Sequence, residues 1–299
     1  MRVSERQRYE TATGRIERAK LNNSNSLNVL ATQKRINTLH DDPIAMTQVI
    51  KKNSQIEENS SFQRNINFTK GFIETTETAL SGIGDRLIRA KELAIAMAND
   101  NYDSKSRSAT AREVAEIINE VVQLGNSNYN NRFVFSGFRT SSPALSQDGN
   151  FLGDDGGIFL QIEDSNYKQI NTPGRFLFGP TPDEQQQGHF GLVSSLEVLR
   201  DSLNEDDKQG IYKAIDELGF HLDKVSSFQA TVGATFNAID QAQQRLESGK
   251  TSLVTRKSEL EDADMYKATS DFKRTETVLQ STLLASNKLL QPSLLNFMQ

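Results

Sequence analysis

The chain has 299 residues, of which 36% are hydrophobic, and its 34 Lys and Arg against 39 Asp and Glu give a formal net charge of −5. This low apolar fraction argues against a compact enzyme with a deep core and favours an elongated protein. The acidic balance argues against nucleic-acid binding, and the lack of cysteine excludes disulfides, thiolate metal sites and cysteine nucleophiles. No apolar run reaches the roughly 18 residues that a membrane span requires.

The first predicted segment, residues 1–40, is helical but thinly supplied with apolar side chains. The polar run 22–26 interrupts its apolar stripe, because Asn and Ser compete with helix by binding the nearby backbone. The segment is also rich in Lys and Arg. We expect a tail that orders when it meets a partner. A transit peptide or a basic arm on a membrane surface is the alternative.

A helix start follows this tail, and it opens the second predicted segment, residues 41–140. Asp42 can cap the free N–H groups, and Pro43 suits the first helical position. From residue 62 to 97, apolar residues alternate at spacings of four and three, the heptad pattern of a helix that packs against another helix. A turn and a shorter helix ending near Gly125 come next. A strand is predicted over 132–138 from its aromatic and β-branched residues. A metal or catalytic pair at Asp41 and Asp42 is the alternative to the cap.

The third predicted segment, residues 141–188, holds four of the six prolines and many glycines. Apolar and polar residues alternate over 158–163, and with 167–170 as the returning strand they predict a β-hairpin. A further short strand is predicted over 175–178. The Gly- and Asp-rich run 148–157 fails the calcium-loop pattern, because Leu152 and Phe159 stand where oxygen ligands are required. We therefore expect a small inserted β-rich domain with an acidic surface.

The fourth predicted segment, residues 189–260, contains the longest repeat of the chain. Every seventh residue from Ile211 to Leu260 is aliphatic, whereas the intervening set turns polar toward Lys257. A repeat of this length, roughly 75 Å of helix, predicts a seam against another helix, and 62–97 is its natural partner. An ordinary amphipathic helix on a globular core is the alternative. The predicted rod seam comprises Ile66, Ile73, Leu80, Leu87, Leu218, Val225, Val232, Ile239, Leu246, Leu253 and Leu260.

The last predicted segment, residues 261–299, is a helix that is apolar on more than one face, so a single partner within the chain would not cover it. We predict that both terminal helices pair and then pack on neighbouring subunits. The predicted assembly interface comprises Val3, Tyr9, Ile16, Leu30, Leu279, Leu283, Leu290, Leu294 and Phe297. The predicted fold is mainly α: an elongated antiparallel coiled-coil helical bundle, with terminal helices disordered until assembled and a small inserted β-rich domain.

A search for catalytic motifs yields no candidate. The three histidines, His40, His189 and His221, are far apart in the sequence and form no metal-ligand pattern. No phosphate-binding loop and no nucleophile elbow is present. We therefore predict no catalytic residue, no cofactor and no metal site. A cytoplasmic coiled-coil scaffold and an unusual enzyme remain as alternatives.

Four stretches resemble the bacterial flagellin superfamily and, within it, the family of hook–filament junction proteins. They are residues 1–4 with Tyr9, residues 41–45, residues 132–140 and residues 260–266. The likeness extends over the whole chain and is loosest over 141–188. His40 departs from the family, which usually has serine before the paired aspartates.

The resemblance implies a structural adaptor of the bacterial flagellum rather than an enzyme. It implies a ring between hook-associated protein 1 and flagellin, built from copies of this chain. It further implies export without a cleaved signal peptide through the flagellar type III apparatus, with an export chaperone on the C-terminal tail, and a location outside the cell. Neither nucleic acid nor membrane is an expected partner. A minor flagellin of the filament is the alternative within the superfamily.

Overall fold

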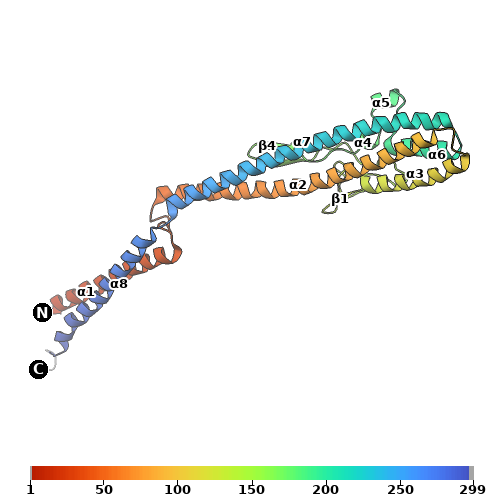
Figure 1. Ribbon diagram of the computed structural model, residues 1–299. Coiled ribbons are helices and arrows are strands. Elements are labelled where there is room, and N and C mark those ends of the chain that lie inside the picture. The colour runs from red at the N-terminus through yellow and green to blue at the C-terminus, as the bar shows by residue number, and fades with distance from the viewer. Residues whose placement is uncertain (1, 296–299) are drawn as a thin grey trace. The chain divides into compact units, whose positions relative to one another are not determined.

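The computed structural model describes residues 2–295, with side chains from 6 to 288, and the chain divides into two compact units (Figure 1). The terminal unit comprises the chain up to residue 58 and from residue 248 onward, and the central unit comprises residues 59–247. The elements in order are α1 (Arg2–Thr32), α2 (Pro43–Met97), α3 (Ser104–Gly125), β1 (Asn128–Tyr129), β2 (Arg132–Phe133), β3 (Phe159–Glu163), β4 (Asn166–Gln169), α4 (Arg175–Phe178), α5 (Pro182–Gln186), α6 (Leu192–Asn204), α7 (Lys208–Glu261) and α8 (Met265–Leu295).

The fold is mainly α, as the heptad patterns predict. Among the described residues, none of these helices is both long enough and apolar enough to cross a membrane. The helix starts follow the sequence signals. Asp42 accepts a hydrogen bond from the backbone N–H of Ala45 at 3.0 Å, immediately ahead of Pro43, and Asp103 caps α3 through the N–H of Ser106 at 2.9 Å.

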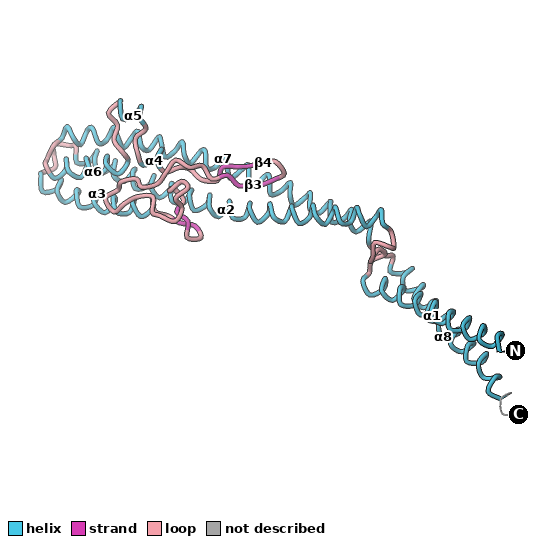
Figure 2. Tube along the Cα trace, turned by 180° about the vertical axis from the view of Figure 1, so that it is seen from behind, coloured by secondary structure: helices cyan, strands magenta, loops and turns pink. Residues whose placement is uncertain are grey.

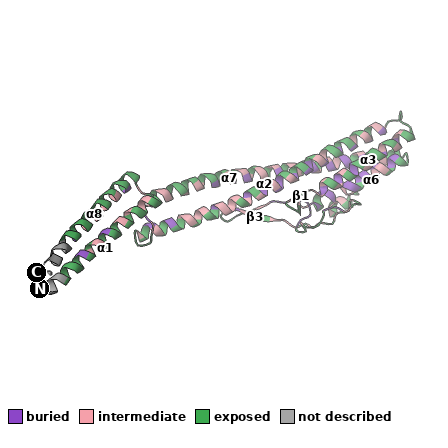
Figure 3. Ribbon diagram, turned by 90° about the horizontal axis from the view of Figure 1, so that it is seen from below, coloured by how far each residue is buried: buried purple, intermediate pink, exposed green. Residues whose placement is uncertain are grey.

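The central unit is built on α2 and α7, which run antiparallel within it, with α3 and α6 packed on each other and against this pair at one end (Figure 2). The pairing register is fixed by contacts between residues far apart in sequence. Lys70 binds Asp240 at 2.6 Å, and the side-chain amide of Asn59 donates to the carbonyl of Leu246 at 3.0 Å. Aliphatic side chains of all four helices form one core, and Figure 3 shows the buried residues concentrated here.

The segment between α3 and α6 contains two short antiparallel hairpins. The hairpin predicted over 158–170 is confirmed: β3 pairs with β4 around a turn in which Ser165 has a φ of 57°. The strand predicted over 132–138 is wrong beyond Phe133. Only β2 pairs, with β1, and the chain then turns inward so that Phe135 packs edge-on against Phe178 at 5.5 Å.

The strand predicted over 175–178 is also wrong, because these residues form the helical turn α4. Leu177 and Phe178 are both buried, whereas a strand with one covered face would bury only every second side chain. The backbone N–H of Gly174 donates to the carbonyl of Phe135 at 2.9 Å, which ties the start of this turn to the aromatic contact. A helix α5 follows, with a capping box formed by Thr181 and Glu184.

In the terminal unit, α1 and α8 lie side by side and antiparallel, so that both chain ends lie at the same end of the pair (Figure 1). Helix α1 runs without interruption through the polar residues 22–26, where its apolar stripe is interrupted. The neighbouring helix provides a polar contact here, since the hydroxyl of Thr275 donates to the side-chain oxygen of Asn23 at 3.4 Å. At the other end of the pair, the backbone N–H of Arg35 donates to the carbonyl of Glu261 at 2.6 Å.

Candidate assembly surface

The contact between α1 and α8 is made largely by small side chains. Ala12 and Ala19 of α1 and Ala268 and Ser286 of α8 are buried. Such residues let two helices approach closely, but they remove little apolar area from water. The four small side chains therefore contribute less to the pairing than large apolar ones would, because helix stability in proteins comes mainly from packing of an apolar face.

The larger apolar side chains of these two helices remain partly or wholly in solvent. Of the predicted interface, Tyr9 is 58% exposed and Leu283 is 38% exposed, whereas Ile16, Leu30 and Leu279 are half-buried. The side chains of four further members lie outside the described residues: Val3, Leu290, Leu294 and Phe297.

The structure adds exposed side chains that the predicted interface does not include. They are Leu21, Leu27, Val278 and Leu284, of which Leu284 is 66% exposed. Periodicity could have found them, but it does not tell which face the partner helix covers. Several large apolar side chains facing solvent on one helix pair indicate a surface that is covered in an assembly.

The predicted rod seam lies between α2 and α7, and its residues differ in burial along the helices. Nine members are buried in the central unit: Ile66, Ile73, Leu80, Leu87, Leu218, Val225, Val232, Ile239 and Leu246. Leu253 and Leu260 are half-buried and belong to the terminal unit. The seam of the central unit is therefore an internal contact, and the surface available to other subunits lies elsewhere.

The seam becomes polar toward residue 59 of α2, as the repeat of α7 predicts. Asn59 is buried there, and its side-chain oxygen has no hydrogen-bond partner among the described residues. The side-chain oxygen of Gln243 is unpaired in the same way, while its amide donates to Glu247 at 2.9 Å. Asn59, which is buried and bonds across to α7, is the kind of amide that fixes the register of a two-helix contact at the expense of stability.

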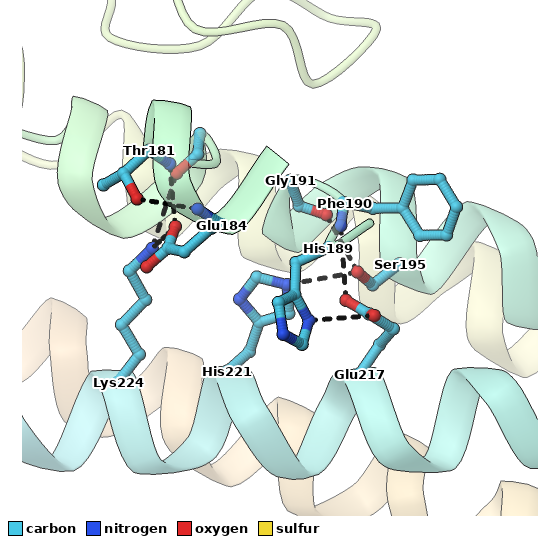
Figure 4. Close-up of polar contacts among 10 residues, drawn as sticks. Thr181, Glu184, His189, Phe190, Gly191, Ser195, Glu217, His221 and Lys224 are labelled. Atoms are coloured by element: carbon cyan, nitrogen blue, oxygen red, sulfur yellow. Dashed lines mark hydrogen bonds and ion pairs between the residues drawn. The ribbon is translucent and has the colours of Figure 1, made fainter. Parts of the chain in front are cut away.

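A buried polar cluster in the central unit brings together two of the three histidines (Figure 4). Glu217, His221 and Lys224 lie on one face of α7 at spacings of four and three. His189 contacts Glu217 at 3.0 Å, and its ring stacks on that of Phe220 with centroids 4.1 Å apart. These contacts attach the loop before α6 to α7.

The second histidine of the cluster, His221, is almost fully buried. Its Nε2 lies 3.1 Å from the hydroxyl of Ser195, which also reaches the carbonyl of Gly191 at 3.0 Å. Burial, with a smaller contribution from the positive charge of Lys224, lowers the pKa of His221 to about 4. The imidazole is therefore neutral at pH 7.

The contact between Ser195 and His221 does not form a catalytic triad. In such triads a carboxylate orients the histidine through Nδ1, whereas Nδ1 of His221 has no partner among the described residues. Glu217 binds His189 instead, and Ser195 has no exposed surface that a substrate could reach. Among the residues described, no group of three or more His, Asp or Glu side chains is placed to hold a metal ion.

Two family models match the ends of the chain. The model of the bacterial flagellin N-terminal helical region matches residues 3–140, and that of the C-terminal helical region matches residues 214–298. The structure pairs these two regions with each other in both units. Residues 141–213, which include the hairpin β3–β4 and helices α4 to α6, lie between the two matches.

Relatives with known names match over most of the chain. Flagellar hook-associated protein 3 of Escherichia coli K12 is 22% identical over 274 residues, which cover 86% of each chain. Its namesake from Salmonella typhimurium is 21% identical over 300 residues, covering 94% of this chain and 95% of the relative. Flagellin of Listeria monocytogenes is 24% identical over 255 residues, covering 85% of this chain and 83% of the relative.

Solved structures share the fold. The structure of flagellar hook-associated protein 3 from Legionella pneumophila matches with a TM-score of 0.62 at 14% identity, covering 71% of this chain and 98% of that one. FlgL of Bacillus cereus matches with a TM-score of 0.60 at 19% identity, covering 70% of this chain and 99% of that one.

Proposed function

Because the chain belongs to the bacterial flagellin superfamily, we propose that it is the structural adaptor at the hook–filament junction of the flagellum. In this role it forms a ring of identical subunits between hook-associated protein 1 and flagellin. The observation that carries the proposal is the nearly full-length match to relatives named flagellar hook-associated protein 3, at both ends of the chain and through the segment between them.

The terminal helices support an assembly role. They present large apolar side chains to solvent, Tyr9, Leu21 and Leu284 among them, on a pair whose fully buried residues are small. Neighbouring subunits that bury several such side chains gain roughly 1.5–3 kcal/mol for each, which can offset the entropy of ordering a helix.

The family is a structural component of the flagellum, and we infer that this chain has no catalytic activity. Its polar cluster is used for packing, since Ser195 and His221 are both buried. We further propose that the chain reaches the flagellum through the type III export apparatus without a cleaved signal peptide. An export chaperone would cover the leucines of the C-terminal helix on the way.

A minor flagellin is the second candidate, and a specific observation favours it. Flagellin of Listeria monocytogenes matches at 24% identity, slightly above the hook-associated proteins, though over a smaller share of the chain than the Salmonella protein. The two roles predict different phenotypes for a strain that lacks the gene. Without a junction adaptor no filament attaches, whereas without a minor flagellin the filament persists.

Electron microscopy of a strain lacking the gene tests the proposal. The expected result is bare hooks with flagellin released into the medium, and filaments restored by the full-length chain. Normal filaments on every hook would contradict the junction role. Fractionation tests the remaining alternative, because a chain found only inside intact cells would indicate a cytoplasmic scaffold.

A further inference from the structure

The α5 segment, residues 180–187, lies on the surface of the central unit, and none of its residues is buried. Its neighbours in the chain differ, since Phe178 before it and Leu192 after it belong to the hydrophobic core. Glycines flank the segment on both sides, and Gly188 has a φ of 85°, a backbone conformation that residues with side chains rarely adopt. The segment can therefore leave the surface while the four-helix core stays intact.

A lysine of α7 holds this segment, as Figure 4 shows. The ammonium group of Lys224 binds the carboxylate of Glu184 at 2.8 Å and lies 3.5 Å from the carbonyl oxygen of Gly179. Glu184 also accepts a hydrogen bond from the backbone N–H of Thr181 at 2.8 Å, which completes the capping box of α5. The attachment therefore depends on an ionised carboxylate more than on apolar packing.

The imidazole of His221 lies one helical turn from Lys224 and is only 1% exposed. Among the described residues outside α7, the charged or titratable groups that act on it are Glu184 of α5 and His189 of the following loop, and α6 contributes the neutral hydroxyl of Ser195. Nδ1 of this ring has no hydrogen-bond partner among the described residues. Movement of the α5 segment admits water to this nitrogen, which removes the cost of a buried unpaired polar atom.

We propose that the α5 segment is an acid-released latch, which leaves α7 as the pH falls while the helices of the central unit remain folded. The proposal concerns the central unit alone, so it can fail or succeed independently of the role at the hook–filament junction.

Two protonation sites favour the open form in acid. Burial first, and the charge of Lys224 second, lower the pKa of His221 from 6.5 to about 4, so between these values the open form takes up a proton that the closed form does not. Burial raises the pKa of Glu184, but the hydrogen bonds from Lys224 and Thr181 outweigh it and hold this pKa below the ordinary 4.5. Protonation of Glu184 then removes the ion pair, so both sites act in the same direction.

The contact between His189 and Glu217 acts in the other direction. A proton on His189 makes this 3.0 Å contact an ion pair, and the backbone N–H of Phe190 donates to the same carboxylate at 3.3 Å. Acid therefore strengthens the attachment of the chain after Gly188 and weakens the attachment before it. The latch turns about residues 188–190 rather than detaching together with them.

A nitroxide spin label at Gln186→Cys tests the proposal on the full-length chain, which contains no other cysteine. Electron paramagnetic resonance should show loss of the immobile component of its spectrum as the pH falls from 6.5 to 4. A label at Ser226→Cys, an exposed position of α7, should keep its mobility over the same range. The helical circular dichroism should persist.

Charge variants identify the contact that holds the latch. Glu184→Gln removes the charge but keeps a residue that suits a capping box, so the label at Gln186→Cys should lose part of its immobile component already at pH 7. Asp183→Asn removes the same charge from the adjacent, exposed position of α5 and should leave the label immobile at pH 7. His221→Gln should reduce the response between pH 6.5 and pH 4.

A label at Gln186→Cys that stays immobile down to pH 4 would overturn the proposal. Simultaneous mobilisation at Ser226→Cys with loss of the helical signal would also overturn it, because the whole unit would then unfold at once. Equal effects of Glu184→Gln and Asp183→Asn at pH 7 would assign the attachment to net charge rather than to the ion pair with Lys224.

Discussion

The imidazole of His221 is held neutral by burial, and this has a consequence for stability. Its folded-state pKa of about 4 lies below the ordinary value of 6.5, so between these values only the unfolded chain takes up the proton. The stabilisation is complete above about pH 6.5 and is lost as the pH falls toward 4. The shift corresponds to on the order of 3 kcal/mol.

We predict that denaturant unfolding of the central unit becomes progressively easier from pH 6.5 to pH 4. His221→Gln removes the titrating group, so it should flatten this dependence even if it lowers stability at pH 7. His40→Gln serves as the control, because His40 is exposed and the dependence should persist. An unchanged pH profile in His221→Gln would assign the effect to other groups.

Two isoleucines of α2 allow a direct comparison of burial. Ile83 is fully buried in the core of the central unit, whereas Ile88, five residues later, is 48% exposed. We predict that Ile83→Ala lowers the free energy of unfolding by about 2–5 kcal/mol through lost burial and a cavity. Ile88→Ala should change it by less than about 1 kcal/mol. Chemical denaturation followed by circular dichroism measures both, and similar losses would contradict the helix orientation.

The long helices are largely predictable from sequence, because a heptad repeat and a cap act locally. Asp42 ahead of Pro43 marks a start that the structure reproduces, and Asp103 caps α3 after the predicted turn. The errors arise where contacts with residues distant in the sequence determine the local structure. Residues 134–138 do not continue the predicted strand, and residues 175–178 form a helical turn, because Phe135 and Phe178 pack against each other.

Helical glycines show how much a neighbouring element matters. A methyl group at Gly233 of α7 would meet open space, so Gly233→Ala should stabilise the helix by up to about 1 kcal/mol. At Gly71 of α2 the methyl carbon would lie 2.4 Å from the hydroxyl oxygen of Tyr129. We predict that Gly71→Ala destabilises the central unit by about 1–3 kcal/mol, through overpacking.

Thermal melts of a double-variant cycle check the cause at Gly71. In a Tyr129→Ala background the ring is gone, so the same glycine replacement should become neutral or stabilising, as at Gly233. A loss of equal size in both backgrounds would mean that the helix itself, rather than the ring, requires glycine at this position.

At the scale of the whole molecule, the two units differ in charge. The central unit, residues 59–247, carries 17 Lys and Arg against 26 Asp and Glu, and the rest of the chain carries 17 against 13. The amino-acid sequence could locate the basic N-terminal segment and the acidic insertion. It could not tell that Glu184 of the insertion binds Lys224 of α7, because that depends on which faces meet.

Deletion of residues 265–299 should separate folding from assembly. The central unit keeps its four-helix core, so the truncated chain should retain a cooperative thermal transition close to that of the full-length protein. It should fail to restore filaments in the strain lacking the gene, because α1 has lost its partner. Loss of the helical signal across the whole truncated chain would contradict the independence of the central unit.

The hydrogen bond between Asn23 and Thr275 joins residues 252 positions apart, so the terminal unit closes only when the first and last helices are both present. Contacts of such long range carry a loop-closure penalty and form slowly. During synthesis, and during any passage through a narrow channel, α1 therefore has no partner helix until α8 is also available to fold. Folding of the terminal unit is therefore completed only with the last helix. A premature stop within α8 leaves the first residues of α1 without a partner.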